Sequence, residues 1–228
     1  MNEIDLKAVG VTVVNQKLYK VPKDTNERHW VIRNPMGQHA IACGVDAPLT
    51  IDIMGHVGFY CGGMNKQAEI VIDGHAGPAV AENMMSGIVR VKGNCAQGAG
   101  ASGRGGLLIV EGDSSSRTGI SMKGIDIVVR GSVGHMSAFM AQSGRLVVCG
   151  DAGDALGDSL YEARIYVRGE VASLGADCVE KELREEHRAE IAELLAAAGF
   201  DDVDPAGFRR YGSARRLYNF DVDDAGEY

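Results

Sequence analysis

One unit of a repeated pattern in this chain reads Leu146-Val147-Val148-Cys149-Gly150-Asp151-Ala152-Gly153-Asp154-Ala155-Leu156-Gly157. Aliphatic residues stand at 146 and 148, a glycine follows at 150, and small residues stand three and seven positions after that glycine. Alternating apolar residues that end at a glycine are typical of a short strand followed by a turn. The unit therefore predicts one strand and the tight bends that lead out of it.

The same unit recurs along the chain at one fixed spacing, without insertion. Its glycine occupies seven positions, each nineteen after the last: Gly55, Gly74, Gly93, Gly112, Gly131, Gly150 and Gly169. In every copy the residue two positions earlier is Ile or Val, and the residue four positions earlier is aliphatic. A unit of this length is too short for a strand–helix–strand element, whose crossover alone takes a dozen or more residues. It matches one coil of a parallel β-solenoid, so we predict an all-β chain built on a single-stranded parallel β-helix of about seven 19-residue coils.

Four charged residues offer a check on that stacking. Asp73, Lys92, Glu111 and Arg130 each precede a repeat glycine, and their charges alternate in sign. Stacked coils place equivalent positions side by side, where opposite charges attract and like charges repel. We therefore expect successive members of this column to attract one another.

The segments on either side of the repeat divide the chain into three parts. Residues 1–48 are expected to form an opening strand or two and a cap over the first coil, because a solenoid end otherwise exposes unpaired strand edges. Residues 49–179 are the β-helix. Residues 180–228 begin with an amphipathic helix from Glu180 to Ala198, which Gly199 stops and which needs the last coil or the solenoid wall as its partner surface.

Composition and charge argue against several classes of function. Of the 31 glycines, 24 lie in residues 49–181, so the excess belongs to the solenoid. A net charge of -8 without a basic stripe argues against nucleic-acid binding. No apolar run approaches the roughly 20 residues of a membrane helix, and no signal peptide is visible. Five cysteines without a C-x-x-C pair fit reduced thiols, so we expect a cytoplasmic protein.

Two patterns inside the solenoid resemble binding sites and are better explained by the coil. Residues 98–103 match the spacing of a dinucleotide-binding loop, but a strand rather than a helix is expected next, so we interpret them as corner glycines. His56 and His75 share one repeat position, and their column continues through Asn94, Asp113, Ser132, Asp151 and Glu170. A straight row does not converge on a metal as tetrahedral ligands do, so a solvated polar row is the favoured interpretation.

Catalytic groups are not evident from the sequence. The cysteines fall at different repeat offsets, so stacking forms no redox pair. A thin acidic zone lies towards the C-terminal coils and consists of Asp113, Asp151, Asp154, Asp158 and Glu170. A self-sufficient β-helix enzyme could use such carboxylates, but a solvated surface is the more common role of such residues. We assign no catalytic, cofactor-binding or metal-ligating residue to this chain.

The tail after the helix combines arginines with aromatic residues, which are enriched at protein interfaces. It is too short to fold alone, so we expect it to dock on this chain or on a partner. The predicted partner interface consists of Phe208, Arg209, Arg210, Tyr211, Arg215, Arg216 and Tyr218.

The repeat resembles the GXGXG domain family. Segments such as Gly112–Gly124 and Leu146–Gly157 carry the resemblance, which covers about residues 50–180. That domain is the C-terminal right-handed β-helix of the glutamate synthase large subunit, and it also occurs in one of the subunits of formylmethanofuran dehydrogenase. The resemblance therefore implies a right-handed coil.

Size, the helix after the solenoid and the segment Ser213–Phe220 are most similar to the GXGXG-type subunit family of methylamine–glutamate N-methyltransferase, also called N-methylglutamate synthase. This resemblance implies a hetero-oligomer with a class II glutamine amidotransferase-like subunit and a glutamate-synthase-like subunit that holds FMN and an iron–sulfur cluster. It implies a reaction that joins methylamine and glutamate into N-methylglutamate and releases ammonia, with the β-helix as a non-catalytic scaffold. The alternatives are a formylmethanofuran dehydrogenase-type subunit and a self-sufficient β-helix enzyme acting on carbohydrate or acyl substrates.

Overall fold

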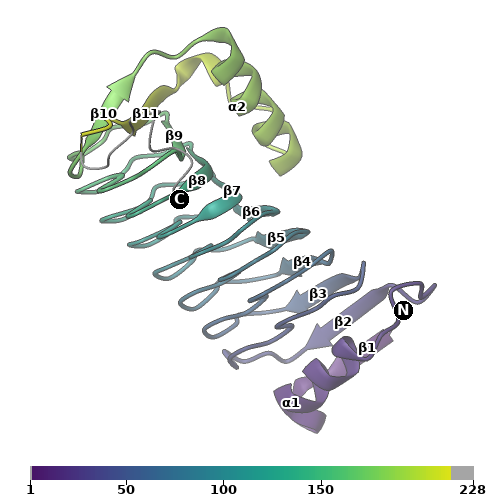
Figure 1. The fold of residues 1–228 in the computed structure, drawn as a ribbon. Helices are drawn as coiled ribbons and strands as arrows, with labels where there is room; N and C mark the ends of the chain where they lie inside the picture. Colours follow the sequence, from purple (N-terminus) through teal and green to yellow (C-terminus); the bar gives the residue numbers. More distant parts are fainter. Residues whose placement is uncertain (1, 217–228) are drawn as a thin grey trace, which may run out of the picture.

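The computed structural model describes residues 2–216, whose strands form a single sheet that runs the length of the molecule (Figure 1). In sheet order the strands are β1 (Asn2–Asp5), β2 (His29–Arg33), β3 (Thr50–Met54), β4 (Glu69–Ile72), β5 (Ile88–Val91), β6 (Leu107–Val110), β7 (Lys123–Val129), β8 (Ser143–Val148), β9 (Arg164–Val167), β11 (Arg209–Ser213) and β10 (Cys178–Lys181). The helices are α1 (Leu6–Tyr19) and α2 (Glu185–Ala198), with a 3₁₀ turn η1 at Pro205–Gly207.

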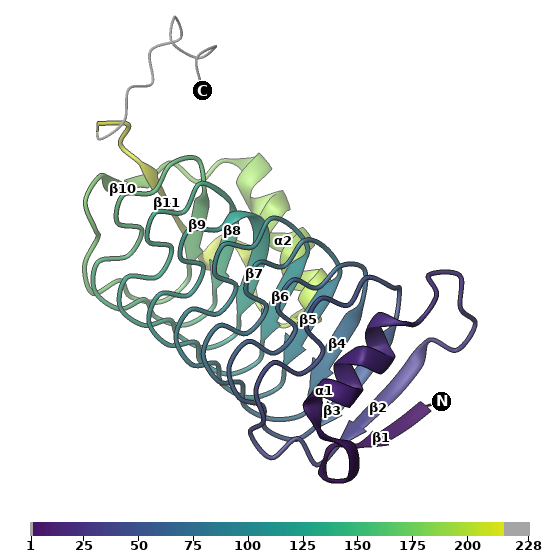
Figure 2. The same ribbon diagram turned by 60° about the horizontal axis from the view of Figure 1, so that its bottom comes forward.

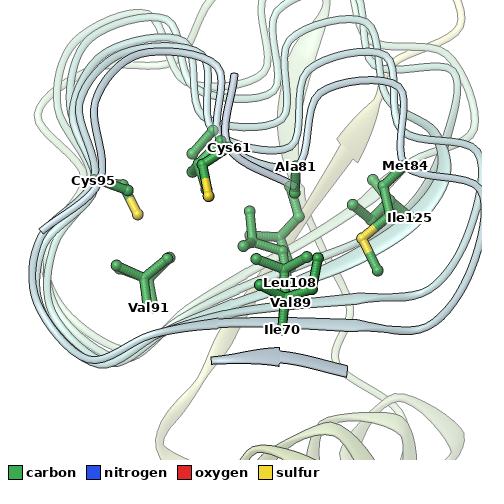
Figure 3. Close-up of a cluster of buried hydrophobic side chains, with 14 of the residues drawn as sticks. Cys61, Ile70, Ala81, Met84, Val89, Val91, Cys95, Leu108 and Ile125 are labelled. Atoms are coloured by element: carbon green, nitrogen blue, oxygen red, sulfur yellow. The ribbon is translucent and has the colours of Figure 1, made fainter. Parts of the chain in front are cut away.

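The sheet from β3 to β9 confirms the predicted parallel β-helix of about seven coils, wound right-handed. Each strand pairs in parallel with the strand one repeat period later, so that Ile51 lies opposite Ile70 and Ile70 opposite Val89. The position four before each repeat glycine becomes an inward ladder of fully buried aliphatic side chains, part of which is visible as the stack of Ile70, Val89 and Leu108 in Figure 3. The sequence period therefore equals one physical turn.

The small residues of the repeat are needed for two different reasons, backbone conformation at one position and space between coils at another. Seven positions after the first six repeat glycines the chain adopts the left-handed conformation, with φ of 66° at Gly62 and 57° at Ala81. Left-handed φ strains most side chains, which favours Gly or another small residue there. Three positions after the repeat glycine the constraint is space, because a Cβ added to Gly77 would lie 2.6 Å from the carbonyl carbon of Gly58 in the preceding coil.

The N-terminal segment supplies the expected opening strands and cap. The strands β1 and β2 extend the parallel sheet, with Trp30 of β2 opposite Ile51 of β3. This offset is two positions longer than the repeat period, which is why the period does not reveal β2. The helix α1 covers the open end (Figures 1 and 2). Its Asn15 side chain donates to the Ala40 carbonyl at 2.7 Å and accepts from the Ala42 N–H at 2.9 Å, so it replaces the missing neighbouring coil.

The helix α2 lies on the outer face of the sheet. Its buried residues pack on the outward side chains of β6–β9: Ile109, Val128, Val147 and Tyr166. The apolar face predicted from the sequence is confirmed, and Gly199 ends the helix with a left-handed φ of 72°. The predicted start at Glu180 is wrong, because Cys178–Lys181 form β10 and the helix begins only at Glu185.

The column of alternating charges forms only one of its expected ion pairs. Lys92 Nζ lies 3.2 Å from Asp73 Oδ1, as expected. Glu111 instead pairs with Arg90 at 2.9 Å, and Arg130 pairs with Asp202 at 2.6 Å. The competing partners come from the outer face of β5 and from the segment after α2, which the repeat pattern does not include.

Candidate functional site

The polar column that begins at His56 is exposed to solvent, as expected, and it is also a hydrogen-bonded ladder. Each member's side chain accepts a hydrogen bond from the backbone N–H of the next member, one coil further along. The acceptor atoms are His56 Nδ1, His75 Nδ1, Asn94 Oδ1, Asp113 Oδ1, Ser132 Oγ and Asp151 Oδ1, at donor–acceptor distances of 2.8–2.9 Å. The bends of the coil leave these N–H groups without a strand partner, so the side chains complete the coil-to-coil bonding.

The two histidines of this ladder have a defined tautomer. Because Nδ1 of His56 and Nδ1 of His75 both accept from a backbone N–H, each neutral ring carries its proton on Nε2. Their rings stack with centroids 4.9 Å apart and planes 9° apart. Within residues 2–216, no three His, Cys, Asp or Glu side chains gather closely enough to hold a metal ion.

The glycine-rich loop at residues 98–103 belongs to a coil, as the sequence suggested. Gly98 and Gly100 adopt left-handed φ values of 73° and 69°, and the next regular element is the strand β6. A dinucleotide-binding loop instead places the phosphates at the N-terminus of a helix that follows directly. The backbone conformation of these glycines is therefore the one the coil requires.

The five thiols are poorly suited to nucleophilic chemistry. Burial raises the pKa of Cys43 and Cys149 to about 11 and that of Cys95 and Cys178 to about 12. Burial also raises the pKa of Cys61, which lies inside the coil with Cys95 (Figure 3). The thiolate is the reactive form, so raised pKa values disfavour reaction. Cys61, Cys95 and Cys178 are small apolar groups of the core, and Cys43 and Cys149 are half-buried.

The acidic zone is engaged in structural hydrogen bonds. Asp113 and Asp151 belong to the ladder. Asp154 accepts from the Ser173 hydroxyl at 3.0 Å, and Asp158 accepts from the Ala176 N–H at 3.2 Å. Glu170 is exposed and forms an ion pair with Arg209 at 3.7 Å. These groups do not converge on a common point as a pair of catalytic carboxylates would.

The tail after α2 docks on its own chain. Strand β11 inserts antiparallel between β9 and β10, and it buries Phe208 and Tyr211, which are only 4% and 2% exposed. These two residues of the predicted partner interface therefore pack inside this chain. Arg215 and Arg216 are exposed and stay a predicted interface, whereas Tyr218 lies outside the described residues.

A basic pocket at the C-terminal end was not anticipated from the sequence. It has a volume of about 460 Å³ and lies between the start of α2 and the strands β9–β11. Five cations line it: Arg164, Lys181, Arg184, Arg210 and Arg215. Arg210 and Arg215 were predicted as interface residues, but no local pattern shows that antiparallel insertion of β11 places Arg210 opposite Lys181. A second hollow of about 450 Å³ adjoins it, and the two share Glu162 and Arg164.

Comparison with known proteins finds one strong similarity. The chain is 57% identical over 228 residues to Protein GlxC of Rhizobium meliloti (strain 1021), and the match covers 100% of both chains. No protein-family model matches the chain. In residues 2–216, every helix is too short or too polar to cross a membrane.

Proposed function

The chain belongs to the family of Protein GlxC, and from this premise we propose that it is a non-catalytic scaffold subunit of a glutamate-synthase-like heteromeric complex. The observation that carries the proposal is the continuity of the core. One cluster of buried side chains runs from Ile4 in β1 to Tyr211 in β11, through every coil between them. Such a core makes the solenoid a stiff rod, which suits a part that holds other subunits at a set separation.

The state of the polar groups supports a structural role. The side chains that most resemble catalytic groups are the ladder carboxylates and the thiols. The carboxylates accept backbone hydrogen bonds between coils, and burial holds the thiols in their protonated form. Groups committed in this way stabilise the rod and are not positioned for proton transfer or nucleophilic attack.

The finer proposal concerns the reaction of the complex. We propose N-methylglutamate synthase, in which methylamine and glutamate give N-methylglutamate and ammonia. Its support is the likeness of the 19-residue repeat to the GXGXG domain. In this assembly a class II glutamine amidotransferase-like subunit and an FMN- and iron–sulfur-containing synthase-like subunit dock on the rod. The rod then sets the path along which ammonia passes from one active site to the other.

Co-purification tests the proposal. The tagged chain is expressed alone, and then together with candidate amidotransferase-like and synthase-like subunits. We expect a colourless, inactive chain in the first case and a complex with flavin and iron–sulfur absorbance in the second, which forms N-methylglutamate from methylamine and glutamate. Turnover of a carbohydrate or acyl substrate by the isolated chain would contradict the scaffold role, as would failure to associate with either partner.

Paired substitutions separate the scaffold from a self-sufficient enzyme. Asp113→Asn and Asp151→Asn keep an acceptor oxygen for the ladder but remove the negative charge. The scaffold proposal expects both variants to assemble and to support complex activity at the wild-type level. Loss of activity in a variant that still assembles would favour carboxylate catalysis on this chain.

A further inference from the structure

The basic pocket holds two cations whose placement is unfavourable without an anion. Lys181 in β10 and Arg210 in β11 are directly opposite each other across an antiparallel pair, so their side chains share one face of the sheet. Like charges at directly opposite positions destabilise a sheet. Both side chains line the pocket, together with His187 from the first turn of α2.

The surrounding carboxylates are taken by other cations. Two carboxylates line the pocket: Glu162 pairs with Arg215 at 2.9 Å, and Glu186 lies 3.8 Å from Arg184 and 3.9 Å from Nε2 of His187. Nearby, Glu190 pairs with Arg164 and Glu182 with Arg184 at 3.0 Å. Within the described part of the chain, neither Lys181 nor Arg210 lies within 4.0 Å of a carboxylate oxygen. Two positive charges at the same end of an otherwise acidic protein are therefore not neutralised.

Arg210 also has an unused hydrogen-bond donor. Its Nη1 donates to the Glu182 carbonyl at 3.3 Å, but its Nε is buried and has no partner among residues 2–216. A buried donor without an acceptor costs free energy, and the cost is larger for a charged group. An unpaired buried donor of this kind calls for an explanation, and an ion or water bound beside Arg210 is one.

His187 adds a neutral donor. Its Nδ1 accepts from the Arg184 N–H at 3.0 Å, so the proton of the neutral ring is on Nε2. Burial and the charge of Arg210 lower the pKa of His187, although Glu186 and Glu190 act in the opposite direction. The pocket thus combines two unpaired cations with an N–H donor and the positive end of the α2 dipole.

We propose that this pocket binds a small oxyanion, a phosphate or a carboxylate, between Lys181 and Arg210. An ammonium and a guanidinium both form strong charge-assisted hydrogen bonds to such oxygens. The bound oxygens neutralise the like-charge pair. This site is a property of the isolated chain, so its test is independent of the scaffold proposal.

Thermal unfolding and calorimetric titration of the full chain test the site. Inorganic phosphate and succinate are compared with sodium chloride at the same ionic strength, because a specific site responds to the oxyanion and simple screening does not. We expect saturable binding and a rise in Tm with at least one of the two oxyanions, and the response identifies which class is preferred. Equal Tm changes in chloride and in both oxyanions would overturn the proposal.

Variants connect any binding to the two cations. Lys181→Gln and Arg210→Gln are each expected to weaken oxyanion binding by at least about tenfold. In chloride alone they are expected to keep or raise Tm, because they relieve the repulsion. Lys17→Gln, in α1 at the other end of the rod, is the matched control and is expected to bind like wild type. Wild-type affinity in Lys181→Gln and Arg210→Gln would assign any binding elsewhere and overturn the proposal.

Discussion

The backbone N–H of His75 donates to Nδ1 of His56 at 2.9 Å, and the two imidazole rings stack one coil apart. The same relation continues along the column to Glu170 with four kinds of side chain: imidazole, amide, carboxylate and hydroxyl. What these side chains share is a hydrogen-bond acceptor close to the backbone. The column is therefore selected by hydrogen bonding between coils rather than by charge.

The ladder predicts how substitutions at Asp113 rank. Asp113→Ala leaves the Ser132 N–H without its acceptor and should lower the free energy of unfolding by about 1 kcal/mol. Asp113→Asn keeps an oxygen at the same place, as Asn94 does naturally, and should be close to neutral. Urea unfolding of the two variants measures the difference. Equal destabilisation by Ala and Asn would show that the carboxylate charge matters instead.

Close contact between coils predicts that two glycine substitutions differ. Gly77→Ala places a Cβ against the backbone of Gly58 and should cost more than about 3 kcal/mol, because backbone atoms of a stacked coil cannot move aside. Gly98→Ala meets nothing nearer than 4.0 Å and loses stability only through its left-handed φ, about 1 kcal/mol. Thermal denaturation of both variants tests this order, which would be reversed if only the backbone conformation of Gly77 and Gly98 mattered.

The N-terminal cap depends on one amide. Asn15→Ala removes both hydrogen bonds to the first coil and should cost about 1–2 kcal/mol. Asn15→Asp keeps the acceptor for the Ala42 N–H but loses the donor to the Ala40 carbonyl, so it should fall between Ala and wild type. Hydrogen exchange at residues 40–44 reports the local opening. Unchanged exchange in Asn15→Ala would show that the apolar contacts of α1 suffice as a cap.

The buried thiols predict a loss of stability at alkaline pH. Their pKa values are raised to about 11–12 in the folded chain, compared with about 8.5 for an unfolded cysteine. The folded state therefore holds these protons more tightly. The resulting stabilisation is complete below about pH 8.5 and is lost as the pH rises through the folded values.

Urea midpoints between pH 7.5 and pH 10.5 measure this dependence, with Cys149→Ala as the comparison that should flatten the slope. Alkylation kinetics provide a second readout: at pH 8 the folded chain should react on the order of a hundredfold more slowly than the unfolded chain. Rapid alkylation of a native thiol at neutral pH would contradict the assignment of these residues to the core.

The strands and inward ladders were predictable because each coil repeats the same local requirements. An aliphatic residue every second position and a glycine once per period recur often enough to determine the strand register. The face and the end of α2 were also visible, in the spacing of Ile191, Leu194 and Ala198 and in Gly199. Strand β2 was not predictable from the repeat, because the offset between paired residues of β2 and β3 is two positions longer than the repeat period.

The sequence by itself determined the repeating coil, because the 19-residue period equals one turn and the small residues stand where stacked coils leave little space. Only the tertiary structure decided which groups meet where the repeat ends. The pairing of Arg130 with Asp202, the insertion of β11 and the placement of Lys181 opposite Arg210 join segments that are separated by more than one coil of chain. These contacts depend on how α2 and the final strands fold back over the sheet. A pattern confined to one coil carries no information about how the chain folds back after the last coil. The basic pocket lies in that C-terminal region.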